Sequence, residues 1–327
     1  MSPSYGAQST ADELVNDYAT QIKDKVILTT GVSPGGLGAF FVEAVAKAQP
    51  ALLILAGRDT AKVRKTADTV SSAQNGVQIR ILELDLLSLK SARNAAAAVN
   101  SWADVPHIDI LVNNAGIMAS AYGLSPDGFE KQFATNHLGP FLFTNLVMEK
   151  ILASRSPRIV NVSSDGHRLS PMRFDDYGFH DGENYNPWSS YGQSKTANIL
   201  MAVSLAEKLG PQRGLLAYSL HPGVIGTNLS NHLDWNVDFG GLKEVDRALG
   251  NAEGWGEFKF KTPSQGVATH VYAAFDPKLQ ARNGAYLLDC HVGDPFTETV
   301  KPWAISPIEA EKLWKLSEKL VGQQFTY

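Results

Sequence analysis

Short apolar runs rich in β-branched residues alternate along the chain with longer amphipathic segments. Seven such runs have the length of buried strands, and they span residues 25–30, 51–57, 77–85, 108–114, 158–163, 215–221 and 285–289. Segments with helical character separate the first six runs, among them residues 40–48 and 91–102. This alternation predicts an α/β fold: one doubly wound domain whose central parallel sheet of about seven strands is flanked by helices.

Three regions depart from this alternation. Residues 165–189 form a loop-like insertion rich in aspartate, glycine and aromatic residues, and residues 224–262 form a second irregular stretch that carries further aromatics. The tail, residues 305–322, has the pattern of a capped amphipathic helix. No stretch has the composition of a linker between independent domains, so no second domain is expected.

The two ends of the chain are predicted to extend this domain. Residues Thr10 to Glu13 form a capping box, which predicts a short helix that ends near Ile22. We therefore divide the chain into an N-terminal extension (1–24), a domain (25–290) that includes the two irregular regions, and a C-terminal extension with a helix (291–327).

Composition and charge narrow the classes of function. Apolar residues make up 44% of the chain and charged residues 19%, which suffices for a large core. The net charge is −4 and the basic residues are scattered, so we expect no nucleic-acid partner. No stretch approaches the roughly 20 apolar residues of a membrane span, and the first residues lack the pattern of a secretory signal. The single cysteine, Cys290, fits a reducing compartment, so we predict a cytoplasmic protein; we also expect no metal site.

The loop TGVSPGGLG, residues 30–38, connects the first apolar run to a helical segment. A dinucleotide-binding turn needs glycines for a sharp bend, for close approach to the pyrophosphate and for tight helix packing. Gly31 suits the bend, and Gly36 and Gly38 suit the approach and the packing. The phosphates would then lie at the helix N-terminus. Four residues separate Gly31 from Gly36, which is not the standard spacing, so a purely structural turn stays an alternative.

The end of the second apolar run favours NADP(H) over NAD(H). An acidic residue there would bind the adenosine ribose hydroxyls, but Gly57 takes that position and Arg58 follows it. The planar guanidinium of arginine binds phosphate well, although a solvated arginine at a strand end is the alternative. Asp85, at the end of the third run, could accept a hydrogen bond from the adenine amino group or could cap a helix.

Tyr191 and Lys195 stand four residues apart at the start of a helical segment, so they share one helix face. A nearby ammonium lowers the pKa of a phenol, and the pair could exchange a proton with a carbonyl or an alcohol. Alone, the pattern is more often an ordinary surface helix. Ser163 and Ser164 end the fifth run, where a hydroxyl could donate to a substrate oxygen, although turn chemistry would also place serines there.

Pro140 lies inside the helical stretch that contains Asn136. Because proline has no N–H, it cannot bond the carbonyl of Asn136, four residues earlier. We expect a kink and a free acceptor that could hold a water linking Lys195 to solvent. A kink that is absorbed by packing is the alternative.

Taken together, these residues resemble the short-chain dehydrogenase/reductase superfamily over about Lys25 to Asp289. The resemblance rests on the glycine loop, Asn113 to Gly116, Asn136, Ser164, Tyr191 with Lys195, and His221-Pro-Gly223 followed by Thr227. The segments RSPRIVNVSSDGHRL, SKTANIL and LWKLSEKLVG resemble the retinol-dehydrogenase-like branch, which includes many fungal pathway reductases of secondary metabolism.

The resemblance implies a Rossmann-like fold and a proton relay. It makes Tyr191 the acid–base, Lys195 the group that lowers its pKa and binds the nicotinamide ribose, Ser164 the group that orients the substrate oxygen, and Asn136 the holder of the relay water. The residues that it implies for binding NADP(H) are Gly31, Ser33, Gly36, Leu37, Gly38, Arg58, Asp85, Leu86, Asn113, Ala115, Gly116, Tyr191, Lys195, Val224, Ile225 and Thr227.

The chain departs from the family pattern in two places. The family has three residues between the first two glycines where this chain has four, so a bulge around Ser33 to Gly35 is expected. The gap between Ser164 and Tyr191 is also long, and its aromatics could wall a substrate site or could pack as a surface flap; they are Phe174, Tyr177, Phe179, Tyr185 and Trp188.

The function that follows is an NADP(H)-dependent oxidoreductase acting on a bulky, partly apolar small molecule beneath a mobile lid, residues 224–262. Carbonyl reduction is favoured because NADPH usually serves as a reductant in cells. Alcohol oxidation, reduction of an activated C=C bond, an epimerase or dehydratase, and a non-catalytic NADP(H)-binding regulator are the alternatives. Family members often dimerise through the helices bearing Asn136 and Tyr191, so a homodimer is possible unless the two extensions block that surface.

Overall fold

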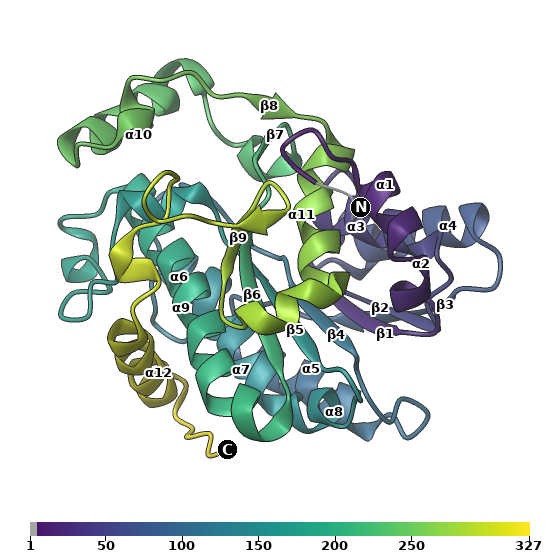
Figure 1. The fold of residues 1–327 in the computed structure, drawn as a ribbon. Helices are drawn as coiled ribbons and strands as arrows, with labels where there is room; N and C mark the ends of the chain where they lie inside the picture. Colours follow the sequence, from purple (N-terminus) through teal and green to yellow (C-terminus); the bar gives the residue numbers. More distant parts are fainter. Residues whose placement is uncertain (1–4) are drawn as a thin grey trace.

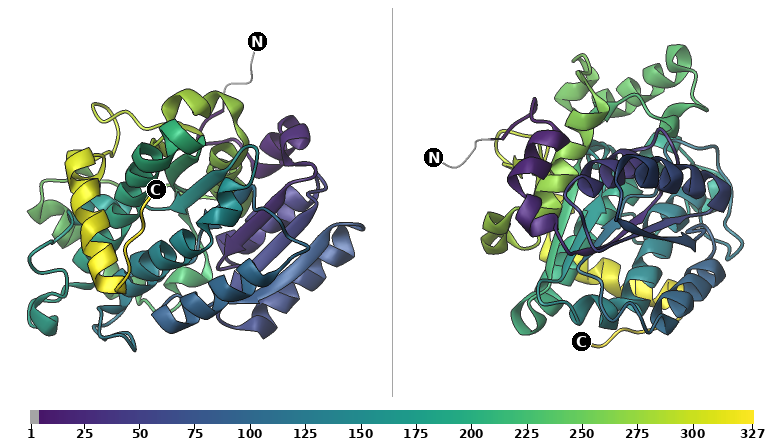
Figure 2. Two further views of the ribbon diagram at one scale, coloured as in Figure 1. Left: turned by 90° about the horizontal axis from the view of Figure 1, so that it is seen from below. Right: turned by 90° about the vertical axis from the view of Figure 1, so that its right-hand side faces the viewer.

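The computed structural model describes residues 5–327, apart from the side chain of residue 236. One main sheet runs through the centre of the molecule and helices cover both of its faces (Figures 1 and 2). All seven predicted strands are present in it, so the α/β prediction is confirmed. They are β1 (Val26–Thr30), β2 (Leu52–Gly57), β3 (Gln78–Glu83), β4 (Ile110–Asn113), β5 (Arg158–Val162), β6 (Leu216–His221) and β9 (Tyr286–Leu288).

The sheet has the order β10-β9-β6-β5-β4-β1-β2-β3, and its strands are parallel except for the edge strand β10 (His291–Val292). The sequence analysis did not predict this eighth strand, which is only two residues long. It folds back on β9 through a turn at Asp289 and Cys290, both of which have positive φ. The strand order reverses between β1 and β4, so the loops that follow these two strands flank a crevice at the carboxyl edge.

Two apolar clusters pack on the two faces of the sheet. One face is covered by α1 (Ala11–Asp17), α3 (Leu37–Ala46), α4 (Thr60–Ala73) and α11 (Pro263–Phe275). The other is covered by α5 (Leu89–Ser101), α7 (Gly139–Leu146), α8 (Met148–Leu152), α9 (Pro187–Arg213) and α12 (Pro307–Val321). Strand β1 is buried along its whole length, as expected for a parallel sheet covered on both sides.

Both predicted terminal helices are present. The capping box of Thr10 and Glu13 starts α1, and α2 (Ala19–Ile22) ends at the predicted residue. Ser306 caps α12, which ends at Gly322 in the left-handed conformation. Helix α12 lies along α9 (Figure 2, left). Within the described residues, no helix combines the length and apolar character needed to cross a bilayer.

The segment 224–262 is more ordered than its sequence predicted. It contains β7 (Val224–Ile225), a helix α10 (Trp235–Ala248) and β8 (Phe260–Lys261), and the two strands pair in parallel to form a second small sheet. The expectation of an irregular stretch was therefore wrong for α10. Two adjacent glycines, Gly240 and Gly241, stand inside this helix and lower its propensity. Helix α10 projects beyond the layers of the main sheet as an arm and contacts α9 (Figure 1).

Candidate active site

The glycine loop lies where β1 meets α3, at the point where the strand order reverses. Gly31 has φ +72°, and a Cβ there would be 2.7 Å from Cα of Ala115. A Cβ on Gly38 would be 2.6 Å from the carbonyl oxygen of Gly31, so both positions require glycine. Gly36 is the N-cap of α3 and supplies no side-chain cap, which leaves the amides of the first turn available to an anion. This arrangement fits a cofactor pyrophosphate.

Asn114, which the sequence analysis did not assign to the site, joins the two loops. Its Nδ2 donates to the carbonyl oxygens of Thr30 at 2.9 Å and Gly31 at 3.2 Å. The Oγ1 of Thr30 accepts from the backbone N–H groups of Asn114 and Ala115, each at 3.0 Å. The neighbouring Asn113 points elsewhere, because its Nδ2 donates to Thr144 and Asn161. The motif identified the segment, but only the structure separates the two roles.

The extra residue of the glycine loop is accommodated in a bulge between two elements. Thr66 of α4 donates to the carbonyl oxygen of Val32 at 2.7 Å, and Asn228 donates to that of Pro34 at 2.8 Å. Asn228 follows Thr227, which caps the short helix η4 (Asn228–Ser230). The glycine loop therefore contacts the segment whose residues Val224, Ile225 and Thr227 the resemblance implies for binding NADP(H), and Asn228 is a further residue of this region.

The adenosine side carries an exposed arginine. Arg58 follows β2, and across residues 5–327 no hydrogen bond or ion pair engages its side chain. The next residue, Asp59, caps α4 by accepting from Ala61 and Lys62. Asp85 accepts from the backbone N–H of Leu87 at 3.0 Å, while Ser88 caps α5, so Asp85 is not the helix cap.

Tyr191 and Lys195 lie on the first turns of α9 with both side chains buried. Nζ of Lys195 is 5.6 Å from the ring centroid of Tyr191 and donates to the carbonyl oxygen of Val162 at 3.0 Å. Burial lowers the pKa of Lys195 to about 8. Burial also raises the pKa of Tyr191 well above its usual value, against a smaller lowering by Ser164. The lowering of the Tyr191 pKa by Lys195 therefore stays a prediction.

Ser164, rather than Ser163, faces Tyr191. Oγ of Ser164 accepts from the backbone N–H of Gly166 at 3.0 Å, and a Cβ on Gly166 would be 2.8 Å from Cε1 of Tyr191. The missing side chain of Gly166 thus lets the serine and the phenol approach each other. Ser163 is buried and donates to the carbonyl oxygen of Lys195 at 2.7 Å, which makes it a support for α9.

Asn136 lies in a distorted helix, as Pro140 predicted. Residues Ala134–Leu138 form a π-helix, η1, between α6 (Lys131–Phe133) and α7. The side chain of Asn136 is fully used: Oδ1 accepts from the N–H of Ile117 at 2.8 Å, and Nδ2 donates to its carbonyl oxygen and to Ser194. Its backbone carbonyl, which Pro140 cannot bond, is the acceptor predicted to hold a relay water. A Cβ on Gly116 would lie 3.0 Å from Asn136 and 3.4 Å from Nζ of Lys195, so the three meet at one point.

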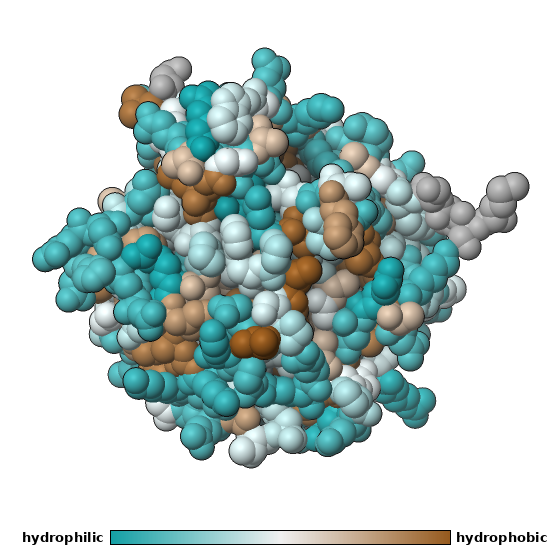
Figure 3. All heavy atoms as spheres, turned by 60° about the vertical axis from the view of Figure 1, so that its left-hand side comes forward, coloured by the Kyte–Doolittle hydropathy of each residue, from teal (hydrophilic) through white to brown (hydrophobic). Residues whose placement is uncertain are grey.

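An apolar cluster lies beneath α10 beside this acid–base set. Its buried members are Ala119, Leu169, Trp188 and Leu242, and Met118, Leu233, Val245 and Phe258 pack against them. Figure 3 shows this side of the molecule, with apolar surface at the base of the projection that α10 forms. Trp188 is three residues before Tyr191, so the cluster adjoins the acid–base residues.

The other four aromatics of the 165–189 insertion pack as a flap. Phe174 and Tyr177 lie against the main core. The rings of Phe179 and Tyr185 meet edge to face at 5.5 Å. Of the two alternatives for this insertion, the packed flap holds for these four residues, whereas Trp188 packs in the apolar cluster under α10.

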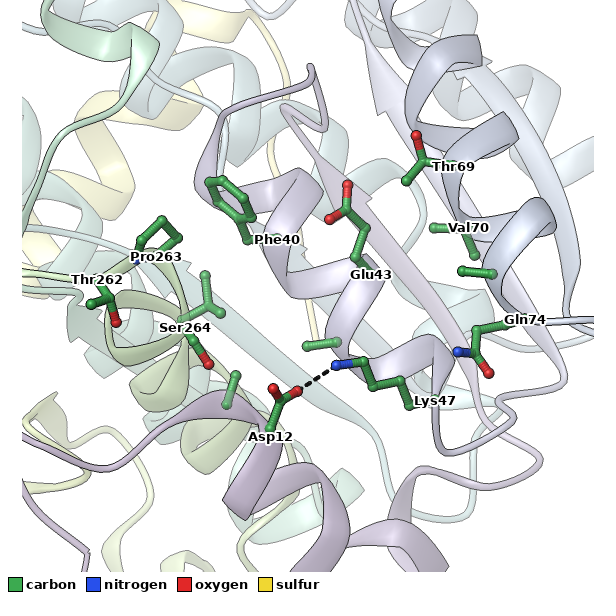
Figure 4. A pocket seen from close by; sticks show the side chains of 14 residues that line it. Asp12, Phe40, Glu43, Lys47, Thr69, Val70, Gln74, Thr262, Pro263 and Ser264 are labelled. Carbon is green, nitrogen blue, oxygen red and sulfur yellow. Dashed lines mark hydrogen bonds and ion pairs between the residues drawn. The ribbon is translucent and has the colours of Figure 1, made fainter.

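A groove of about 460 Å³ lies between α1, α3, α4 and the start of α11 (Figure 4). Phe40 and Glu43 face it, and an ion pair of 2.6 Å between Lys47 and Asp12 closes one end. None of the acid–base residues lines it, so the groove is separate from the candidate active site.

Comparison with known proteins identifies the family of this chain. The family model described as short chain dehydrogenase matches residues 25–179. Short-chain dehydrogenase/reductase prx1 of Penicillium roqueforti is 37% identical over 94% of this chain and 88% of its own. Human retinol dehydrogenase 11 is 34% identical over 92% of this chain and 87% of its own.

A solved structure has a similar fold along nearly the whole chain. It is an uncharacterised protein from Mycobacterium paratuberculosis, with a TM-score of 0.68, 29% identity and coverage of 94% of this chain and 96% of its own. The chain therefore belongs to the short-chain dehydrogenase/reductase family of oxidoreductases, in its retinol-dehydrogenase-like branch.

Proposed function

We propose that this protein is an NADP(H)-dependent oxidoreductase that reduces a carbonyl group of a bulky, partly apolar small molecule. The observation that carries the proposal is that the buried Tyr191 and Lys195 and the partly buried Ser164 lie together at the carboxyl edge of the sheet. This edge also holds the glycine loop and the uncapped start of α3. The apolar cluster under α10 supports the class of substrate.

The residues at this edge suit a nicotinamide cofactor, which supplies the hydride when bound. Gly31, Gly36 and Gly38 would hold its pyrophosphate, and Lys195 its nicotinamide ribose. Arg58 would bind a 2′-phosphate, because its guanidinium is exposed and the preceding residue is glycine rather than an acid.

The protein's own residues move the proton. Ser164 orients the substrate oxygen, and the phenol of Tyr191 donates a proton to that oxygen as negative charge develops on it. The buried Lys195 ammonium stabilises the phenolate that is left. The backbone carbonyl of Asn136, which Pro140 cannot bond, would hold the water that returns a proton from solvent.

Steady-state turnover tests the proposal. The purified protein is incubated with NADPH or NADH and a panel of ketones, aldehydes and enones, and the absorbance of the reduced nicotinamide is followed. We expect consumption of NADPH with apolar ketones or aldehydes, and Tyr191→Phe should lower kcat by about 10²-fold or more. Tyr177→Phe is the matched control. Tyr177 lies in the flap, and its ring packs against Phe133 of α6.

The outcomes separate the alternatives. Turnover of enones alone would replace carbonyl reduction by C=C reduction. Cofactor binding with no net consumption would favour an epimerase, a dehydratase or a regulator, and unchanged turnover in Tyr191→Phe would disprove the proton path.

A further inference from the structure

A buried arginine lies shortly after β5, the strand that leads to Ser164. Arg168 lies in the short helix η2 (Asp165–Leu169), four residues after Ser164, and its side chain is 2% exposed. Its Nε and Nη2 donate to the two carboxylate oxygens of Asp246, each at 2.8 Å. Its Nη1 is 2.7 Å from Oδ2 of Asp165. Paired guanidinium–carboxylate bonds of this kind fix geometry as well as charge.

The partner Asp246 belongs to α10, the helix that forms the arm over the site. Its carboxylate is fully buried, and Asn251 donates both to it at 3.0 Å and to the carbonyl oxygen of Arg168 at 3.3 Å. The arm also touches the body through the apolar cluster and a bond of 3.2 Å from Trp188 to the carbonyl oxygen of Asp238. Arg168 is thus a charged contact between the arm and the loop after β5.

The other partner, Asp165, continues the connection to the reacting groups. Ser164 donates to Oδ1 of Asp165 at 3.2 Å, and the backbone N–H of Asp165 donates to Nδ1 of His221 at 3.1 Å. Asp246, Arg168, Asp165 and Ser164 therefore form a continuous chain of polar contacts, which we call the Arg168 bridge. It runs from α10 to the hydroxyl that faces Tyr191.

We propose that Arg168 is a positioning residue: it couples the docking of α10 over the substrate site to the placement of Ser164 and the acid–base behaviour of Tyr191. A buried charge pair costs free energy when one partner is removed, because the other charge is left unpaired. An undocked α10 would take Asp246 away from Arg168, so the bridge is complete only when the arm covers the site. The kinetic part of this inference rests on the proposed function.

The charges of Asp165 and Arg168 also connect the bridge to Tyr191. Burial favours the protonated form of Asp165, but His221 and Arg168 overcome it and lower the Asp165 pKa to about 2, so the group is a carboxylate. That carboxylate raises the pKa of Tyr191 and Arg168 lowers it. The titratable and charged groups that act on Tyr191 or lie against its ring are Asp165 and Arg168 from η2, Lys195 from α9 and Tyr286 from β9. His167 of η2 and His221 of β6 act in turn on Asp165.

Asp246→Asn tests the arm side of the bridge, and Glu244→Gln is its matched control. Glu244 is exposed on the same helix, and the two substitutions remove the same charge. We expect Asp246→Asn to increase amide hydrogen exchange across residues 231–256 and to raise KM about tenfold, equivalent to about 1.4 kcal/mol of binding. Glu244→Gln should match the wild type in both measurements.

Arg168→Gln and Arg168→Lys test the catalytic side. Loss of the guanidinium should move the alkaline limb of the pH profile of kcat/KM upward by about one unit, because Asp165 then acts on Tyr191 without compensation. Arg168→Lys keeps the charge and should leave the limb in place. Where Arg168→Gln does not fold, as judged by near-ultraviolet circular dichroism, Asp246→Asn and Arg168→Lys still decide.

The results distinguish the proposed bridge from a contact that only anchors the arm. Wild-type exchange and KM in Asp246→Asn overturn the bridge. Increased exchange without a change in KM or in the pH profile also overturns it, because Asp246 would then only anchor the arm. If the wild-type protein turns over no carbonyl substrate, the proposed function fails, and the exchange experiment still judges the contact between Arg168 and Asp246 of α10 by itself.

Discussion

Burial determines the protonation state of His270, which its position in the sequence does not reveal. His270 on α11 is fully buried, its ring lies 6.0 Å from that of Phe41, and within the described chain neither of its ring nitrogens has a hydrogen-bond partner. Burial lowers its pKa to about 3. The folded protein therefore keeps this histidine neutral at pH values where the unfolded chain protonates it.

This histidine should make the protein sensitive to acid. Between pH 6.5 and 3 the unfolded state binds more protons, so the free energy of unfolding falls as the pH falls, by on the order of 2 kcal/mol at pH 5 from His270 alone. His270→Leu should remove that share of the dependence. Urea denaturation at pH 8 and pH 5 measures it, and an equal loss of stability in the variant and the wild type would contradict it.

Arg58 is the residue on which the cofactor preference depends. We expect Arg58→Ala to raise KM for NADPH at least about tenfold and to leave KM for NADH nearly unchanged, because only NADPH carries the 2′-phosphate. Arg64→Ala, an exposed arginine on α4, is the control. An equal loss for both cofactors would show that Arg58 contributes structure rather than selectivity.

At this scale, helical periodicity was enough to predict that Tyr191 and Lys195 share a face, and the structure buries both. It was not enough to distinguish neighbouring asparagines or serines. Asn113 and Ser163 brace the sheet and α9, while Asn114 and Ser164 face the two loops of the site. Alternation along a strand puts neighbours on opposite sides, and which side faces the crevice depends on the loop that follows.

Helix α12 packs on the core with its apolar face, as its amphipathic pattern predicted. Trp314 is 3% exposed, and its ring meets that of Phe141 on α7 edge to face at 5.0 Å. His137 of the π-helix lies 2.7 Å from Ser317 of α12, so this helix also supports the segment that carries Asn136.

Truncating Trp314 should therefore be costly. We expect Trp314→Ala to lower the free energy of unfolding by about 3–5 kcal/mol, since it leaves a large cavity between α12 and α7. Phe296→Ala, at a ring that is 94% exposed, should change it by less than about 0.5 kcal/mol. Chemical denaturation of both variants checks this, and similar values for the two would show that α12 is not part of the cooperative core.

The pattern of apolar and polar residues did not predict helix α10. Its apolar face packs in a small cluster with only four buried side chains, one of which, Leu242, is its own. Its two glycines hide the periodicity that would have predicted a helix. The contact of Asp246 with Arg168, 78 residues earlier, could not be inferred from local sequence.

For the whole molecule, the position of α12 bears on oligomerisation. The family often pairs through the helices that carry Asn136 and Tyr191, here η1–α7 and α9. In this protein α12 lies along α9, Ser204 of α9 donates to Ala310 of α12, and Tyr327 donates to Asn145 of α7 (Figure 2). The C-terminal extension thus covers the surface through which two copies would meet.

We expect the protein to sediment as a monomer of 35.4 kDa. Analytical ultracentrifugation over a range of concentrations measures this directly. A dimer of about twice that mass that persists at micromolar concentration would show either that another surface pairs or that α12 joins the interface.

The sequence by itself determined the strand–helix alternation, and with it the parallel sheet, the edge at which ligands bind and the helix face shared by Tyr191 and Lys195. These follow from local periodicity and from the short range of helix and strand geometry. Only the tertiary structure decided which serine faces the phenol, which asparagine holds the glycine loop, and that Arg168 joins α10 to the reacting groups. Those choices depend on contacts between residues distant in sequence, whose burial and pairing no local pattern contains.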